Sequence, residues 1–326
     1  MIEVDNTLME GKTMNDLNKY IVYKSKDVGI DICRFTDCLP LKTVEGQLYA
    51  RKEGNRMTEF EENDINKRID PKLAFPSCKS IIVLGISYNV DYKDKPNYKY
   101  RGKLSMSSWG MDYHRVLREK IENLIGEIEK VAEFQYKYFV DTGPLVDREL
   151  AVKAGVGYYG KNCSVINEEY GSFIFLGHIL TDLELEFNSP VESQCGDCNL
   201  CLRACPTGAL EEPGQLNPKK CISYLTQTKN EIPTDLKKKM GIKIYGCDTC
   251  QLVCPKNKGV KKSDHEEFIP MITKGYMDLE ELKVISNSQF KRKYGHMAGS
   301  WRGKNILKRN AKIIMDNVFL TESSKK

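Results

Sequence analysis

The pattern of apolar and polar residues predicts that helices and strands are mixed along the first part of the chain. Residues 15–28 carry apolar side chains at helical spacing, and Gly29 follows as a residue suited to end a helix. Residues 113–131 show the same spacing over a longer stretch. Three apolar runs indicate strands, at 81–88, 135–141 and 173–179. Elements mixed in this way to about residue 186 indicate one α/β domain.

The rest of the chain divides into two further parts. Residues 187–264 are rich in cysteine, proline and glycine, and so many loops require a stabilising element other than a hydrophobic core. The last part is helical, with Asp278 as the N-cap of a helix over 279–294 and a second amphipathic helix over 305–320. The predicted fold class is therefore α+β. The predicted domains are 1–186, 187–264 and 265–326.

The composition is that of a globular protein. The chain has 326 residues, of which 40% are hydrophobic and 29% charged. No apolar run approaches the roughly 18 residues that a membrane-spanning helix needs. The first residues also lack a basic segment followed by an apolar one, which an export signal would have. We therefore expect a cytoplasmic monomer that has no contact with a membrane.

Charge is distributed unevenly. The whole chain has a formal net charge of +5, but residues 288–326 contain ten Lys plus Arg and two Asp plus Glu, a net charge of +8. The preceding residues therefore carry −3. A basic C-terminal part on a slightly acidic body predicts an anionic partner at that end, although lysines on a solvated helix face would give the same composition.

Cysteines are the most informative residues of the sequence. Eight of the twelve lie between Cys195 and Cys254, and in a reducing compartment such clustering indicates metal or redox chemistry before disulfides. The run CGDCNLCLRACP has the spacing C-x2-C-x2-C-x3-C-P, which is typical of bacterial iron–sulfur proteins. A second run, CDTCQLVCP, lacks the first cysteine of that pattern, and Cys221 can replace it.

These spacings predict two 4Fe-4S clusters. The ligands of the first cluster, here called the first set, are Cys195, Cys198, Cys201 and Cys254. The second set is Cys205, Cys221, Cys247 and Cys250. Two structural zinc sites are the alternative. The four other cysteines are expected to be free, buried apolar residues: Cys33, Cys38, Cys78 and Cys163.

Three further features offer candidate chemistry. The loop GVGYYGKN at 155–162 matches G-x-G-x-x-G, but a helical segment precedes it, so we predict neither a dinucleotide-binding turn nor a P-loop. Asp141 ends a predicted strand and opens the turn DTGP, where an aspartate is usually a cap. The four histidines match no metal-binding motif, and we expect structural roles for His114, His178, His265 and His296.

The chain resembles the epoxyqueuosine reductase family. The matching segments are SWGMDYH, VDTGPLVDRELA, AGVGYYGKNC, CGDCNLCLRACPTGAL, CISYLTQTK, YGCDTCQLVCP and FKRKYGHMAGSWRGK. The resemblance implies an N-terminal domain that binds cobalamin, a ferredoxin-like domain with two clusters, and a helical part that holds tRNA. The family commonly continues into HEAT-like repeats, so we expect a shortened form of that module, with its helix packed onto the body of the protein.

The resemblance also implies roles for individual residues. Asp141 is the expected proton donor and a contact of the cobalamin. The other expected cobalamin contacts are Arg68, Ser105, Ser223 and Asp248. Ser105 stands where relatives usually carry cysteine, so that position is not expected to be essential for the chemistry. The cobalamin is expected in its base-off form with no histidine ligand from the protein. The expected tRNA contacts are Lys229, Arg292, Lys293, His296, Ser300, Trp301, Arg302, Lys304 and Arg309.

The predicted function is reduction of the epoxide of epoxyqueuosine in tRNA to give queuosine. Electrons from an external ferredoxin or flavodoxin would pass through the two clusters to cobalamin, and Asp141 would protonate the leaving oxygen. Two alternatives are a corrinoid reductase of a small molecule, such as a dehalogenase, and a two-cluster electron carrier. The basic C-terminal part argues against the first, and the 186 residues before the clusters argue against the second.

Overall fold

The computed structural model describes residues 14–323. The chain forms two compact units that interleave along the sequence. The first unit comprises residues 1–86, 117–158 and 175–193, and the second comprises 87–116, 159–174 and 194–326. These contact-based units follow boundaries other than 1–186, 187–264 and 265–326, and that three-part division stays a prediction.

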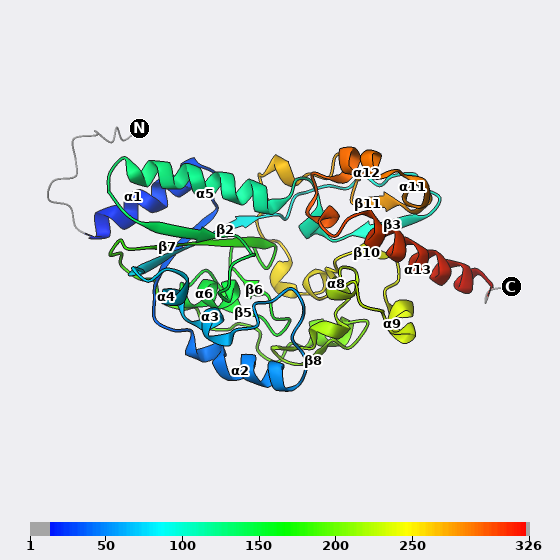
Figure 1. Ribbon diagram of the computed structural model, residues 1–326, viewed down its shortest axis with the longest axis horizontal. Coiled ribbons are helices and arrows are strands. Elements are labelled where there is room, and N and C mark those ends of the chain that lie inside the picture. Colours follow the sequence, from blue (N-terminus) through cyan, green and yellow to red (C-terminus); the bar gives the residue numbers. More distant parts are fainter. Residues whose placement is uncertain (1–13, 324–326) are drawn as a thin grey trace. The chain divides into compact units, whose positions relative to one another are not determined.

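A four-stranded sheet in the order β1-β2-β7-β4 forms the centre of the first unit (Figure 1). Its strands are β1 (Ile32–Asp37), β2 (Ser80–Ser87), β7 (Ile174–Thr181) and β4 (Tyr136–Phe139). Every residue of β2 is buried, as its continuous apolar sequence predicts. The predicted strands 81–88, 135–141 and 173–179 are thus confirmed within two residues at each end, and β1 was not predicted.

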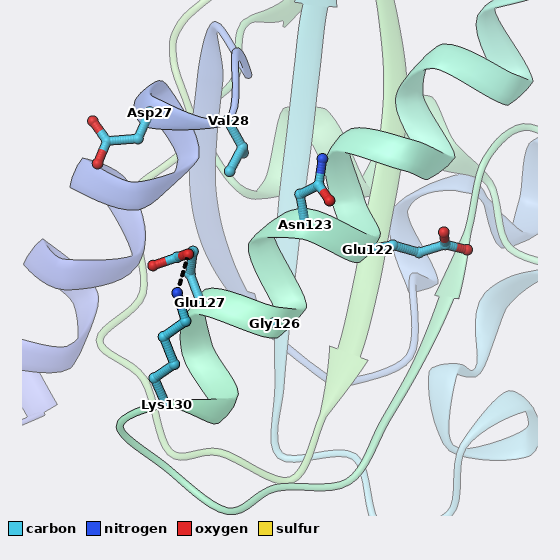
Figure 2. A pocket seen from close by; sticks show the side chains of 7 residues that line it. All are labelled: Asp27, Val28, Glu122, Asn123, Gly126, Glu127 and Lys130. Carbon is cyan, nitrogen blue, oxygen red and sulfur yellow. Dashed lines mark hydrogen bonds and ion pairs between the residues drawn. The ribbon is translucent and has the colours of Figure 1, made fainter.

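Helices lie on both sides of this sheet (Figure 1). The helices of the first unit are α1 (Met14–Asp27), α2 (Lys42–Glu53), α3 (Ile65–Ile69), α4 (Pro71–Ala74), α5 (Tyr113–Glu129) and α6 (Asp147–Lys153). The hydroxyl of Tyr20 on α1 donates to the carbonyl of Glu127 on α5 at 3.1 Å, and the Lys24 ammonium lies 3.6 Å from the Glu127 carboxylate. Glu127 and Lys130 border an open hollow beside this contact (Figure 2).

The second unit contains a three-stranded sheet in the order β10-β3-β11. Its strands are β10 (Lys243–Tyr245), β3 (Arg101–Leu104) and β11 (Tyr276–Asp278). Three helices pack against it and share one hydrophobic core with its residues Leu104, Ile244 and Met277: α11 (Leu279–Val284), α12 (Asn287–Tyr294) and α13 (Lys304–Ser323). A sheet with helices packed against it confirms the α+β class.

The predicted helix over 279–294 is divided in the structure. Asp278 is its N-cap as expected, because its carboxylate accepts from the backbone N–H groups of Glu280 and Glu281. The helix nevertheless ends before Ile285, and Ser286 then caps α12 through a capping box with Gln289. Two strong caps eight residues apart, at 278 and 286, therefore give two short helices instead of one long helix.

Short elements make up the cysteine-rich segment and several connections before and after it. The helices are α7 (Leu200–Ala204), α8 (Ile222–Leu225), α9 (Thr234–Lys239) and α10 (Thr249–Leu252). Two hairpin sheets join β5 (Tyr158–Tyr159) to β6 (Val165–Ile166) and β8 (Leu210–Glu212) to β9 (Gln215–Leu216). The 3₁₀ turns are Met106–Ser108, Pro218–Lys220, Pro255–Asn257, Glu266–Phe268 and Ala298–Ser300. Among the described residues, no helix is long and apolar enough to cross a membrane.

Two of the cysteines expected to be free are joined in a disulfide. Cys38 and Cys78 are bonded, with their Cα atoms 6.1 Å apart. Antiparallel pairing of β1 with β2 places Asp37 opposite Ser80, and this register brings the two flanking cysteines together. Both residues are buried as expected, but the expectation of free thiols is wrong for this pair. It is confirmed for the buried Cys33, whereas Cys163, which is outside any disulfide, is only half-buried.

Helix α13 joins the two halves of the cysteine-rich segment. Asn310 is 0% exposed, and its amide nitrogen donates to the carbonyl of Thr226 at 2.7 Å and to that of Ile244 at 2.9 Å. Ile313, one turn further along, packs with Ile222 and Leu225 of α8. The expectation that this helix packs onto the body is confirmed.

Replacing Asn310 should destabilise the second unit. Asn310→Ala leaves two buried carbonyls without their donor, at about 1–3 kcal/mol each, so the free energy of unfolding should fall by about 2–6 kcal/mol. Thermal unfolding of the purified protein measures the change. Asn317→Ala, which removes one 2.9 Å bond to the carbonyl of Lys237, is the control and should cost less. Equal losses in the two variants would contradict the role given to Asn310.

Candidate functional site

The eight clustered cysteines are all free and half-buried; Cys201 lies in α7, Cys250 lies in α10, and the others lie on short loops around α7, α8 and α10. Three of the first set flank the start of α7, where Gly196 adopts a φ of 48° that favours glycine. Cys254 of the same set follows α10, and α10 packs against α7. Cys221 of the second set is the residue before α8.

Electrostatic interactions connect thiols within each of the two predicted sets. Burial raises the pKa of Cys254, and the neighbouring Cys195 and Cys198 raise it further. The pKa of Cys201 is also raised, first by burial and then by Cys254 and Cys195. The four members of the first set therefore lie close to one another.

The second set behaves in the same way. Burial raises the pKa of Cys221 to about 11, with Cys247 and Cys205 adding to the effect. Burial also raises the pKa of Cys250, which interacts with all three other members of its set and with Cys201 of the first. The two sets are thus neighbours.

Cys205 differs from Cys221 and Cys250 of the same set, because its pKa is lowered and not raised. Burial opposes the charge of the Cys205 thiolate, but hydrogen bonds from the backbone at Leu210, Thr207 and Ala209 outweigh it and lower the pKa of Cys205. Within residues 14–323, no three His, Cys, Asp or Glu side chains come as close together as a single metal ion requires. A 4Fe-4S cluster is a larger body and takes one thiolate for each iron.

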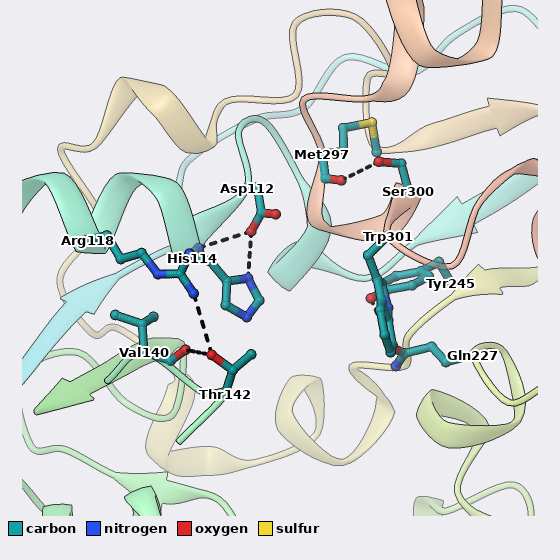
Figure 3. A network of polar contacts seen from close by, with 10 residues as sticks. All are labelled: Asp112, His114, Arg118, Val140, Thr142, Gln227, Tyr245, Met297, Ser300 and Trp301. Carbon is teal, nitrogen blue, oxygen red and sulfur yellow. Dashed lines mark hydrogen bonds and ion pairs between the residues drawn. The ribbon is translucent and has the colours of Figure 1, made fainter. Parts of the chain in front are cut away.

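Asp141 occupies a tight turn directly after β4. Its φ of 59° lies in the left-handed region, which aspartate tolerates better than most residues, and its side chain is exposed. The turn is held by Thr142, whose backbone N–H donates to the carbonyl of Val140 at 2.6 Å and whose hydroxyl accepts from Arg118 at 3.5 Å (Figure 3). The next helix, α6, has Val146 as its N-cap.

A pair that the sequence did not predict, the buried His178 and the half-buried Asp147, lies beside this turn. The pKa of Asp147 is raised, mainly by burial and also by the charge of Asp141, while the contact with His178 lowers it. His178 is 1% exposed, and its Nδ1 lies 3.2 Å from the Asp147 carboxylate. The structural role expected for His178 agrees with this burial. No spacing rule connects residues 147 and 178, so only the fold could reveal the pair.

Arg68 lies in the last turn of α3 and forms an ion pair in the first unit. Its guanidinium donates to Glu61 at 2.9 Å, and Arg51 donates to the other oxygen of the same carboxylate at 2.7 Å. Burial opposes the charge of Glu61, but Arg51, Thr58 and Arg68 outweigh it and lower its pKa. Arg68 is therefore held in place by a partner that the sequence did not identify.

Ser105 and Asp248 are in direct contact in the second unit. The Ser105 hydroxyl donates to one oxygen of the buried Asp248 carboxylate, and the backbone N–H of Met106 donates to the other at 2.9 Å. Both residues line a small cavity together with Cys247 of the second set. The backbone at Gly246 lies close to Ser105, since a Cβ at position 246 would be 2.4 Å from the Cβ of Ser105.

Ser223 lies on α8. Among the described residues, we find no hydrogen bond from Ser223 to Ser105 or Asp248. The carbonyl of Ser223 accepts from the hydroxyl of Thr226 and from the amide of Gln227, each at 2.9 Å. The expected cobalamin contacts therefore divide between the units: Arg68 and Asp141 belong to the first, and Ser105, Ser223 and Asp248 belong to the second.

Several residues of the basic C-terminal part bind carbonyl groups of the protein itself. Arg309 donates to the carbonyls of Leu225 at 2.9 Å and of Thr228. Lys304 donates to the carbonyl of Ile285 at 2.9 Å, and Lys293 pairs with Glu281 at 2.7 Å. These cations shape the surface in addition to charging it.

Other members of the expected tRNA set are exposed or half-buried. Trp301 is 53% exposed, and its indole N–H donates to Gln227 at 3.0 Å (Figure 3). Arg302 stacks on that ring at 4.6 Å and donates to the backbone carbonyl of Gln227. Lys229 and Arg292 are exposed. Burial lowers the pKa of His296, and Ser300 donates to the carbonyl of Met297 at 2.8 Å.

Family models match two segments of the chain. A 4Fe-4S double cluster binding domain covers residues 194–257, which contains all eight clustered cysteines, and Epoxyqueuosine reductase QueG, DUF1730 covers residues 68–142. The first match favours two clusters over the alternative of two zinc sites. The fold and the double-cluster domain together define an iron–sulfur oxidoreductase.

Comparison with complete proteins identifies the family. Epoxyqueuosine reductase of Bacillus cereus is 44% identical over 299 residues, which cover 90% of this chain and 79% of the relative. That of Lactococcus garvieae is 41% identical over 308 residues, or 93% of this chain and 88% of the relative. The chain belongs to the epoxyqueuosine reductase family. This assignment excludes the alternatives of a small-molecule reductase and a simple electron carrier.

Solved structures agree over most of the chain. A crystal structure of epoxyqueuosine reductase with an epoxyqueuosine-modified tRNA-Tyr stem loop has a TM-score of 0.90 and 41% identity, and it covers 94% of this chain and 82% of that one. The Bacillus subtilis enzyme, solved with its catalytic aspartate loop swung out of the active site, has a TM-score of 0.88 and 40% identity at the same coverage.

Removing one thiol of the second set should remove one cluster. Each cluster needs four thiolates, so Cys221→Ser should lower the iron content of anaerobically reconstituted protein from about eight to about four per chain. Cys33→Ser, at a buried cysteine outside both sets, should keep about eight. A variant at Cys221 that still binds eight iron would contradict the assignment of the second set.

Proposed function

We propose that the protein reduces the epoxide of epoxyqueuosine at the wobble position of tRNA and thereby forms queuosine. The match to epoxyqueuosine reductases over nine-tenths of the chain carries this proposal. The reaction consumes two electrons and two protons: both carbon–oxygen bonds of the epoxide break, the oxygen leaves as water, and a carbon–carbon double bond forms. The chain must therefore supply electrons, a proton at the leaving oxygen, and a surface for RNA.

The two thiol sets would hold two 4Fe-4S clusters that carry the electrons. Four free thiols in each set suit one cluster each, and the interaction of Cys250 with Cys201 suits transfer from one cluster to the other. An external donor of the ferredoxin or flavodoxin type would reduce them. The second set would lie toward the substrate, because Cys247 lines the same cavity as Ser105 and Asp248.

Cobalamin is the proposed second cofactor. When bound, it supplies a low-valent cobalt that delivers electrons to the substrate. Arg68, Ser105, Asp141, Ser223 and Asp248 would hold it. Some of these polar groups already have fixed positions, because Glu61 holds Arg68 and the carboxylate of Asp248 holds the turn at Ser105. No histidine of the protein would be needed to hold it, and His178 is buried against Asp147.

Asp141 would donate the proton to the leaving oxygen. Its turn projects the side chain to the surface after the last residue of β4. A carboxylic acid holds its proton near neutral pH when burial raises its pKa, and because this side chain is exposed, the bound substrate and cofactor must provide the burial. A catalytic aspartate on a loop of the Bacillus subtilis enzyme supports this role.

The basic C-terminal part would bind the anticodon stem loop. Exposed Lys229 and Arg292 would contact phosphates, and the exposed ring of Trp301 could stack on a base of the loop. The remaining expected contacts are Lys293, His296, Ser300, Arg302, Lys304 and Arg309, and their internal hydrogen bonds would keep this surface in a fixed shape for RNA. A tRNA substrate also supports the proposals of a cytoplasmic enzyme and of a helical tRNA-binding part at 265–326.

Loss of the Asp141 carboxyl should abolish most of the activity. General acid catalysis contributes about 10²–10⁴-fold, so Asp141→Asn should lower kcat by at least about 100-fold on epoxyqueuosine-containing tRNA. Iron content and tRNA affinity should stay unchanged. Asp94→Asn, at an exposed aspartate paired with Lys274, is the control and should keep full activity. An undiminished rate in Asp141→Asn would refute the proton-donor role.

Arg292 and Arg309 should respond differently to substitution. Arg292→Ala should weaken tRNA binding and reduce the slope of log Kd against log salt by about 1, as expected for one lost phosphate contact. Its melting temperature should not change. Arg309→Ala removes donors from buried carbonyls and should instead lower the melting temperature. An unchanged salt slope in Arg292→Ala would remove that residue from the proposed tRNA surface.

A further inference from the structure

The glycine-rich loop that matched a nucleotide-binding pattern has a different location in the structure. Helix α6 precedes it, which confirms that it is neither a dinucleotide-binding turn nor a P-loop. Residues 160–163 form the tip of the β5–β6 hairpin, where the N–H of Gly160 donates to the carbonyl of Ser164 at 2.8 Å. A Cβ at Gly160 would lie 2.6 Å from the end of the Ile166 side chain, so the tip is closely packed.

Lys161 at this tip reaches the loop of the first set. Its ammonium donates to the carbonyl of Gly196 at 2.6 Å and to the side-chain oxygen of Asn199 at 3.1 Å. Each acceptor directly follows a cysteine of the first set, Cys195 or Cys198. The half-buried lysine thus places a positive charge inside the loop that carries three of the four thiols.

Asn162, the next residue, reaches the second set. It is 6% exposed, and its amide nitrogen donates to the carbonyl of Cys250 at 3.5 Å. Its side-chain oxygen accepts from the backbone N–H of Ser164 at 3.1 Å, which fixes the orientation of the amide. Two adjacent side chains of one turn therefore contact the loop of the first set and the backbone of a cysteine of the second set.

We propose that this hairpin tip braces both cluster-binding loops, and that Lys161 is a positioning residue whose charge raises the reduction potential of the cluster held by the first set. The proposal rests on the proposed function, in which the two sets hold clusters. Reduction adds one electron to a cluster, and a nearby cation stabilises the more negative form. Because the hydrogen bonds hold the ammonium beside Gly196 and Asn199, its position relative to the first set does not depend on the flexibility of the lysine side chain.

The charge can be separated from the hydrogen bonds by two substitutions. Lys161→Gln keeps a donor but removes the charge, and Lys161→Arg keeps both. Redox titration followed by electron paramagnetic resonance measures the midpoint potential of each cluster in the full-length protein. The step that disappears in Cys221→Ser belongs to the second set. Lys79→Gln, at an exposed lysine of the first unit paired with Glu184, is the control.

Lys161→Gln should shift the reduction equilibrium of the first cluster about tenfold toward the oxidised form, which is about 59 mV for one electron. Lys161→Arg and Lys79→Gln should stay close to the wild type, and the second cluster should change less. If Lys161→Gln loses about four iron while Lys161→Arg keeps eight, the charge is needed to assemble the first cluster, which also supports the proposal.

Two results would overturn the inference. One is an unchanged potential in Lys161→Gln with all iron retained, and the other is equal loss of iron from Lys161→Gln and Lys161→Arg. Asn162→Ala tests the second half of the brace and should alter the spectrum of the second cluster while the first keeps its potential; the reverse pattern would contradict it. A wild-type protein that cannot bind about eight iron would instead refute the proposed function.

Discussion

The cysteine-rich segment depends on hydrogen bonds supplied from outside it. Its helices have four to six residues, and such short elements cannot hold eight thiols in position by their own packing. Donors therefore come from distant parts of the second unit. Asn310 on α13 binds the carbonyls of Thr226 and Ile244, and Lys161 on the β5–β6 hairpin binds the carbonyl of Gly196. These contacts join segments that lie far apart in the sequence into one support for the clusters.

This arrangement gives the C-terminal helix two roles. One face of α13 belongs to the hydrophobic core formed with the β10-β3-β11 sheet, and Ile313 packs on α8 beside the second set. The cations on the same helix shape the proposed RNA surface, since Arg309 binds the carbonyls of the loop that also contains Gln227. Substitutions in this helix can therefore alter the electron path and the RNA surface together, which is why stability must be measured beside tRNA affinity.

Patterns that are local in the sequence predicted the structure well. The continuous apolar runs gave β2 and β7, and the helical spacing gave α1 and α5, while the division of the clustered cysteines into two sets stays a prediction. Features that depend on contacts between distant residues could not be predicted in this way. Strands β3, β10 and β11 have three or four residues each and are defined by their pairing. The Cys38–Cys78 disulfide follows from the register of β1 against β2, and the partnership of Asp147 with His178 follows from α6 packing on β7.

The position of Asn310 also fixes the order in which the thiols and part of their support are synthesised. All eight clustered cysteines precede Asn310 in the sequence, so the ribosome releases every thiol before it releases the amide that ties Thr226 to Ile244. Before α13 docks, the loop after Cys221 and the strand before Cys247 can still join through the bond from the N–H of Gly246 to the hydroxyl of Thr226 at 2.9 Å, but they lack the two donors of Asn310. During synthesis the thiols therefore emerge before this part of their support.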